Sequence, residues 1–435
     1  MAVTLDSPRE LTLPSGFNPQ GALLVADGPT TYLVNNASSG DSTRCMVIRA
    51  TAEGARAYSY SVNNGATACT AFGTHPEGFL LRVEDPTAME EIDGHTVFVE
   101  FDGTERWRVP DRRLVDAEGA PGGPGEFRGE YFGAIAPLLY SPAIDRVLGS
   151  SIGTVTIGQD VRYLGQHHLL NPNTGNITRN GFTLGSSGVG IPVGGVVRSG
   201  GDFLIVQDTL GLDGTVFHTW DGRSNVARYE PLAGEWEGKT LRRIAYLPGT
   251  TYLMWIEGVP EVTDDIPAFI AATNDDAATL WEANFETTYR FRNGDFVFLG
   301  PPLDLQVSPD WAIITYRWEN DYYLRLIDEN GGTPGIARLT STTPLEPLGI
   351  LATSEGVRLV TANQERIIEY SLEFEDVPDW DPNAILEDVG IDDAVDAVLD
   401  EAGCGCGAGG SGNLFLAIGF AVFSFVGRSR ARRRR

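Results

Sequence analysis

A serine flanked by glycines is the first pattern in this 435-residue chain that could support catalysis. Gly149-Ser-Ser-Ile-Gly153 matches Gly-x-Ser-x-Gly, in which a sharp turn from a strand into a helix exposes a nucleophilic serine. Here Thr154-Val-Thr-Ile follows, and β-branched residues of this kind favour a strand. The motif therefore predicts no nucleophile. Since no other catalytic set is recognisable, we expect no catalytic residues.

Histidines are the next candidates, and only His167 and His168 are adjacent. Neighbouring side chains of a strand point to opposite faces, so these two cannot easily bind one metal ion. We expect one of them to be packed and the other exposed. The same structural interpretation applies to the lone His75, His95 and His218, and no metal site is predicted.

Oxygen-rich turns raise the question of calcium. Asp379-Trp-Asp381-Pro-Asn383 begins like a calcium loop, but Ala384 and Gly390 stand where an EF-hand needs glycine and glutamate. The segment therefore predicts a solvated linker. Thr273–Asp276 and Asp328–Asn330 fit either loosely held calcium or ordinary turn chemistry. We expect no cofactor, with calcium as the open alternative.

Cysteines fall into two pairs. Cys45 and Cys69 are the only two before residue 404, and in an exported protein such an isolated pair predicts a disulfide. Two unpaired buried thiols are the alternative. Cys404 and Cys406 lie instead in a glycine-rich segment near the C-terminus.

An apolar run and a block of arginines follow that segment. The uncharged run Leu414–Val426 reaches the roughly 20 residues of a bilayer span when the small residues of 408–413 are included. Six arginines then favour retention of the C-terminus in the cytoplasm, with everything before Cys404 across the membrane: Arg428, Arg430, Arg432, Arg433, Arg434 and Arg435. A buried core helix with a frayed end would be the alternative.

This order of cysteine motif, apolar helix and arginine cluster resembles the MYXO-CTERM sorting tail of myxobacteria and their relatives. The resemblance covers residues 404–435 only. It implies an exported protein that is processed near its cysteines, with Cys404 or Cys406 as the modified residue, and displayed on the cell surface or outer membrane. Residues 1–10 contain no signal peptide, so we expect the true start to lie upstream or the signal to have been cut. The alternative is a cytoplasmic protein whose tail is not a sorting signal.

Net charge excludes one class of partner. The chain carries −27, and leaving out the six terminal arginines makes the remainder about −33. Phosphates would be repelled, so we expect no nucleic acid and no peripheral binding to anionic lipid. The membrane would be reached through the C-terminal helix alone.

Strand patterns repeat along most of the chain. Apolar strands, polar loops and turns rich in Asp, Asn and Gly recur at intervals of about fifty residues. The units begin near Tyr32, Phe79, Leu138, Phe203, Tyr252, Trp311 and Val357. The pattern predicts an all-β fold, a β-propeller of about seven blades, with six or eight also open and a pair of β-sandwiches as the alternative.

Three regions follow from these patterns. Residues 1–373 form the propeller-like body, 374–403 an acidic linker with a short amphipathic helix, and 404–435 the sorting tail. The predicted function is a surface-anchored binding or scaffold protein with an unknown protein or glycan ligand. The alternative is a secreted propeller hydrolase or lyase with carboxylates converging at the channel mouth.

Overall fold

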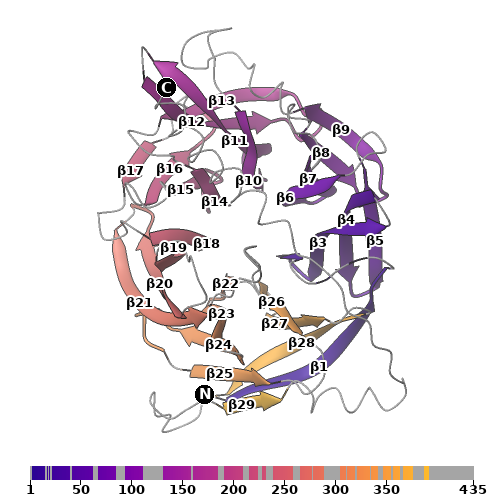
Figure 1. Cartoon of the computed structure of the whole chain (residues 1–435), viewed down its shortest axis with the longest axis vertical. Coiled ribbons are helices and arrows are strands. Elements are labelled where there is room, and N and C mark those ends of the chain that lie inside the picture. The colour runs from indigo at the N-terminus through magenta and orange to yellow at the C-terminus, as the bar shows by residue number, and fades with distance from the viewer. Residues whose placement is uncertain are drawn as a thin grey trace, which may run out of the picture.

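The computed structural model consists of strands and turns, and Figure 1 shows them arranged as a closed ring. The structure describes residues 2–14, 17, 19, 22–39, 42–61, 67–84, 94–110, 131–157, 160–184, 191–208, 215–223, 228–231, 239–257, 265–276, 278–288, 304–309, 311–318, 321–333, 335–340, 346–353, 356–362, 366–375 and 387–390.

Seven antiparallel sheets form the blades of a β-propeller, which confirms the predicted fold and blade number. The first three blades are β2–β5, β6–β9 and β10–β13, each in chain order from the channel outward. Their strands are β2 (Leu23–Asp27), β3 (Thr30–Ser39), β4 (Ser42–Thr51), β5 (Gly54–Tyr60), β6 (Ala68–His75), β7 (Gly78–Glu84), β8 (His95–Glu100), β9 (Glu105–Pro110), β10 (Tyr131–Ser141), β11 (Arg146–Ile157), β12 (Asp160–Leu170) and β13 (Ile177–Leu184).

Blades 4, 5 and 6 follow the same order. Blade 4 contains β14 (Ile191–Val197), β15 (Phe203–Asp208), β16 (Thr215–Trp220) and β17 (Arg228–Pro231). Blade 5 contains β18 (Lys239–Leu247), β19 (Thr250–Glu257), β20 (Asp265–Asn274) and β21 (Thr279–Thr288). Blade 6 contains β22 (Asp304–Val307), β23 (Ala312–Trp318), β24 (Asp321–Ile327) and β25 (Gly335–Thr340).

Blade 7 closes the ring by joining the two ends of the body. Its inner strands are β26 (Glu346–Thr353), β27 (Gly356–Ala362) and β28 (Arg366–Glu375), and its outermost strand is β1 (Ala2–Thr12). β1 pairs antiparallel with β28, from Ala2 opposite Glu375 to Thr12 opposite Arg366. With β1 in place, blade 7 has four strands like the first five blades, and the ring of blades is closed.

The core lies between neighbouring blades. Successive residues of a central strand face opposite sides of its sheet, and in a radial blade both sides meet another blade. Tyr32 and Val34 of β3 therefore pack toward blade 2, whereas Leu33 packs toward blade 7, and all three are buried. This two-sided burial explains why the middle strands read as nearly continuous apolar runs.

The predicted repeat units begin one strand late. Tyr32, Phe79 and Phe203 lie in the second strands of their blades, and of the seven predicted starts only Leu138 lies in an innermost strand. Innermost strands are hard to recognise because their pairing is irregular. β6, β10, β14, β18 and β26 each show a register shift against their partner strand. Such bulges interrupt the alternation that marks a strand.

The region beyond the body differs from the sequence expectation at two places. Residues 374–375 still belong to β28, and Glu387–Gly390 forms strand β29 where a short helix was expected. β29 pairs with the outer edge of β25, so backbone pairing overrides the helical pattern there. The rest of the acidic linker, 376–386 and 391–403, and the tail 404–435 lie outside the described residues.

Aromatic side chains of outer strands cover turns of the next blade. Trp107 of β9 lies on Gly175, in the turn between β12 and β13, and Trp281 of β21 lies in the same way on Gly331. Gly175 has φ +67°, and a Cβ at this position would lie 2.7 Å from Trp107 Cδ2. Only glycine combines this backbone conformation with so close an approach.

Gly175→Ala is therefore expected to lower the free energy of unfolding by about 3 kcal/mol, from backbone strain and overpacking together. Gly28→Ala is the matched control, because Gly28 has φ +55° with nothing within 4 Å of the added Cβ. It should cost only about 1 kcal/mol, for the left-handed backbone alone. Urea unfolding measures both variants. Equal losses would show that the contact with Trp107 contributes nothing.

Candidate functional site

The predicted disulfide is confirmed. Cys45 of β4 and Cys69 of β6 are bonded, with their Cα atoms 5.0 Å apart and 24 positions apart in sequence. The bond joins a central strand of blade 1 to the innermost strand of blade 2. It closes a loop whose covalent constraint is worth about 3 kcal/mol on the loop-entropy model. Its role in the described structure is to hold two blades together.

The residues predicted for processing and membrane orientation lie outside the described part of the chain. These are Cys404, Cys406, Arg428, Arg430, Arg432, Arg433, Arg434 and Arg435. Among the described residues, no helix is long and apolar enough to cross a membrane. The sorting tail therefore remains a prediction from the sequence.

A serine and a histidine do meet beside the Gly-x-Ser-x-Gly motif. Ser150, one residue before the central Ser151, has its Oγ 3.0 Å from Nδ1 of His167. β11 and β12 are adjacent strands and place the two residues opposite each other. Both side chains are enclosed, at 3% and 0% exposure, so a substrate has no access to the pair. Burial also lowers the pKa of His167 well below its usual range, with help from His218 and His168.

Of His167 and His168, one was expected to be packed and the other exposed, and only the first half of this prediction holds. His168 is as buried as His167, so neither of the two is exposed. The reason is that β12 is a central strand of blade 3 and is covered on both faces. The rings of His167 and His218, on neighbouring blades, are 6.4 Å apart. Among the described residues, no group of three His, Cys, Asp or Glu side chains is arranged to hold a metal ion.

The described oxygen-rich turns follow turn chemistry. Asp328 Oδ1 accepts hydrogen bonds from the backbone N–H groups of Asn330 and Gly332, at 2.8 Å each. Asn274 Oδ1 accepts from those of Asp276 and Ala278. Each side-chain oxygen replaces a turn carbonyl, as Asx turns do. Asp379 and Asp381 lie outside the described residues.

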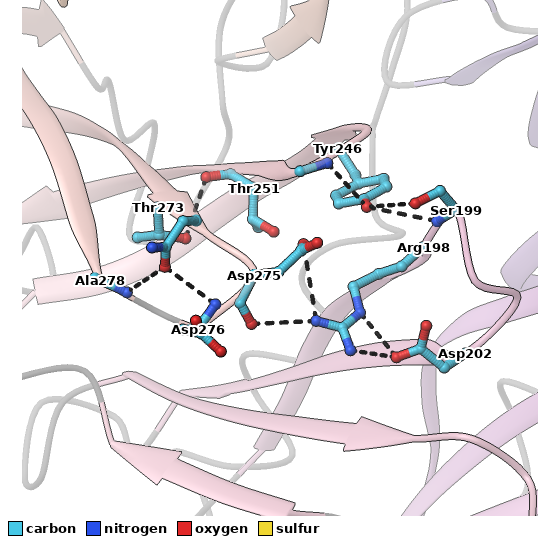
Figure 2. A network of polar contacts seen from close by, with 11 residues as sticks. Arg198, Ser199, Asp202, Tyr246, Thr251, Thr273, Asp275, Asp276 and Ala278 are labelled. Atoms are coloured by element: carbon cyan, nitrogen blue, oxygen red, sulfur yellow. Dashed lines mark hydrogen bonds and ion pairs between the residues drawn. The ribbon is translucent and has the colours of Figure 1, made fainter.

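A small polar cleft lies between blades 4 and 5, and Figure 2 shows the contacts around it. Its volume is about 10 Å³, room for about one water molecule. Seven residues line it: Arg198, Leu204, Phe217, Thr219, Thr251, Asn274 and Asp275. The lining side chains come from four strands and two turns of the two blades.

Arg198 is the centre of this cleft. Its Nε donates to Asp202 Oδ2 at 2.8 Å, and its Nη1 donates to the backbone oxygen of Asp275 at 3.2 Å and lies 3.8 Å from Asp275 Oδ1 (Figure 2). The pKa of Arg198 is raised because the two carboxylates outweigh its burial. With two anions and a backbone oxygen around it, this guanidinium has little to offer an anionic ligand. The contacts of Arg198 at the cleft thus connect blade 4 to blade 5.

Similar bonds recur around the ring. Among the described residues, side chains of one blade donate to turn carbonyls of the next in five places: Arg56 to Phe101 and Asp102, with Tyr58 also to Phe101, Trp107 to Pro172, Ser141 to Gly201, Arg198 to Asp275, and Arg358 to Gly28. All six acceptors lie in turns that join first to second or third to fourth strands. We call these six donors the donor belt, and the face that carries these turns the turn face.

The opposite face carries the longest connections of the ring. Because consecutive strands are antiparallel, the links from second to third strands and from blade to blade all begin and end there. We call it the connection face. The four longest of these links are residues 13–22, 85–94, 111–130 and 289–303. Binding residues concentrate in loops that a rigid scaffold positions, so the connection face is the candidate binding surface.

Sequence reasoning missed the donor belt and the proximity of Ser150 to His167. One signal was available in part: Tyr58 and Trp107 each follow a turn glycine, Gly54 or Gly103, by four residues. The spacing identifies an aromatic residue at the same place in two blades. It does not identify the turn of the next blade on which that residue packs.

Comparisons with known proteins assign the chain to no family. No family model matches the chain, and no curated protein does. Solved structures of similar shape include YCF48 bound to D1 peptide, 11% identical over 85% of this chain and 98% of that one, TM-score 0.44. The Nup133 β-propeller domain of Vanderwaltozyma polyspora is 6% identical, over 81% and 100%, at 0.42. An apocarotenoid oxygenase of Synechocystis is 11% identical, over 82% and 87%, at 0.42. At these values we draw no functional inference from them.

The buried histidines predict acid sensitivity. Burial lowers the pKa of His218 from 6.5 to about 4, so the unfolded chain binds a proton that the folded chain refuses between these pH values. Stability is then constant above pH 6.5 and falls as the pH drops toward 4, by about 3 kcal/mol from this group.

His218→Phe should reduce the slope of the free energy of unfolding against pH by the amount that corresponds to about one bound proton. The measurement is the free energy of unfolding in urea at several pH values between 7 and 4, for the natural chain and the variant. The slopes are compared, so a constant offset from altered packing does not matter. Identical slopes would contradict the assignment.

Proposed function

We propose that this protein is a cell-surface binding propeller that recognises its ligand through the connection face. The observation that carries the proposal is the difference between the two faces. The turn face consists mainly of short turns joined by the donor belt, whereas the four longest links of the ring belong to the connection face. A rigid ring with long links on one face is the usual arrangement of a binding scaffold.

The body's acidity indicates the chemistry of the ligand. With about −33 outside the terminal arginines, the surface repels polyanions and favours a neutral or cationic partner. A protein or an uncharged glycan meets this condition, and nucleic acid does not. The rival interpretation is a hydrolase or lyase with carboxylates converging at the channel mouth, and the enclosed Ser150–His167 pair is not a site of that kind.

Export is supported by the disulfide between Cys45 and Cys69. Such bonds persist in oxidising compartments and are rare in the cytosol. Attachment is supported by the apolar run Leu414–Val426 and the six arginines after it, which resemble a sorting tail. On this proposal, residues 376–403 apart from β29 link the body to its anchor.

Site-specific photocrosslinking in the producing cells tests the binding face. A benzophenone amino acid at Phe127 or Phe296, in the two longest links, should capture the partner at least fivefold more efficiently than the same group at Glu53 or Asp276. The two controls are exposed on the turn face. Equal capture from both faces, or capture from the turn face alone, would refute the proposed binding surface.

Deletion of residues 404–435 tests the anchor. The truncated protein should appear in the medium, as measured by immunoblot of cell and medium fractions. A matched variant, Cys404→Ser with Cys406→Ser, keeps the apolar run and the arginines, and should stay in the membrane with its tail unprocessed. If the truncated protein remains with the cells, the tail is not the anchor.

A further inference from the structure

Blade 6 differs from the other blades in having a fifth strand. β29, residues Glu387–Gly390, pairs in parallel with β25, from Ala337 opposite Glu387 to Thr340 opposite Gly390. Each of the other six sheets contains four strands. β29 follows the last strand of the body in sequence, yet it is added to the neighbouring blade.

β29 also lies beside β1, the strand that closes the ring. Both strands run from the turn face to the connection face, and they contact each other along the outer rim of blades 6 and 7 (Figure 1). Within its sheet, β1 is hydrogen-bonded on one side only, to β28. Its other edge therefore forms the rim of blade 7, close to β29.

The path of the chain shows that β29 adds a second connection between blades 6 and 7. Residues 341–345 already lead from β25 of blade 6 into blade 7, and residues 376–386 lead from β28 back to β29 on blade 6. β1, in contrast, is covalently continuous only with blade 1, through residues 13–22. The chain therefore crosses the boundary between blades 6 and 7 twice. This boundary lies next to β1, which closes the ring by hydrogen bonding to β28.

We propose that β29 is a strap that holds the closing strand in place. For the ring to open, β1 must separate from β28. With β29 paired, blade 7 cannot swing away from blade 6, and the rim next to β1 remains occupied. The strap should therefore suppress local opening of β1 more than it stabilises the ring as a whole, since its own pairing spans only four residues. This inference rests on strand pairing and does not depend on surface display.

Proline substitution in the full-length chain tests the strap. Asp388→Pro with Val389→Pro removes two consecutive backbone donors, at least one of which faces β25, and so prevents pairing. Asp388→Thr with Val389→Thr is the matched control, because it loses the same charge and keeps both donors. Hydrogen exchange of amides in β1, β25 and β13 is followed by mass spectrometry, with β13 as an outer strand on the opposite side of the ring (Figure 1).

The proline variant should exchange at least fivefold faster in β1 and β25 and unchanged in β13, and the threonine variant should match the natural chain. Faster exchange in β25 without β1, or equal acceleration in all three strands, would overturn the proposal. A second variant, Arg338→Cys with Asp388→Cys, joins register partners of β25 and β29. Its oxidation should slow exchange in β1 at least threefold, and no slowing would also overturn the proposal.

Discussion

Ring closure is the constraint on which every other feature of this propeller depends, and a pairing between the two ends of the body achieves it. Within that pairing, Glu369 of β28 is 2% exposed and lies 3.0 Å from Arg9 of β1 and 3.2 Å from Arg358 of β27. Loss of either cation would leave this buried carboxylate with less compensation for its lost hydration, so charge favours the observed register of closure. A shift of one residue would turn Arg9 to the other face of its sheet.

Closure has different consequences for the two faces. On the turn face, Arg56, Trp107, Ser141, Arg198 and Arg358 donate to carbonyls of the next blade, and each hydrogen bond is made only when neighbouring blades are in contact. These bonds replace those that the turn carbonyls would make with water, so each contributes about 1 kcal/mol. The connection face contains the four longest links of the ring, so the face proposed for binding is not the one that the donor belt holds.

Two devices reinforce the ring at different places. The disulfide Cys45–Cys69 ties blades 1 and 2 covalently, and β29 ties blade 6 to blade 7 through its pairing with β25. The disulfide needs an oxidising compartment, whereas the strap needs only backbone groups. Together they lie on both sides of the closing strand, whose chain enters blade 1 after completing blade 7.

The sequence by itself determined the all-β class, the approximate number of blades and the partner of Cys45, because alternation, turn residues and cysteine number are local or countable. It also supplies the whole argument for the tail. Only the tertiary structure decided that β1 completes blade 7, that Glu387–Gly390 is a strand, and that Ser150 and His167 share one enclosed contact. The first two depend on segments brought together at ring closure, and the third depends on the pairing of β11 with β12 and on its burial within the ring. No local pattern encodes such contacts, since their energy appears only when distant segments meet.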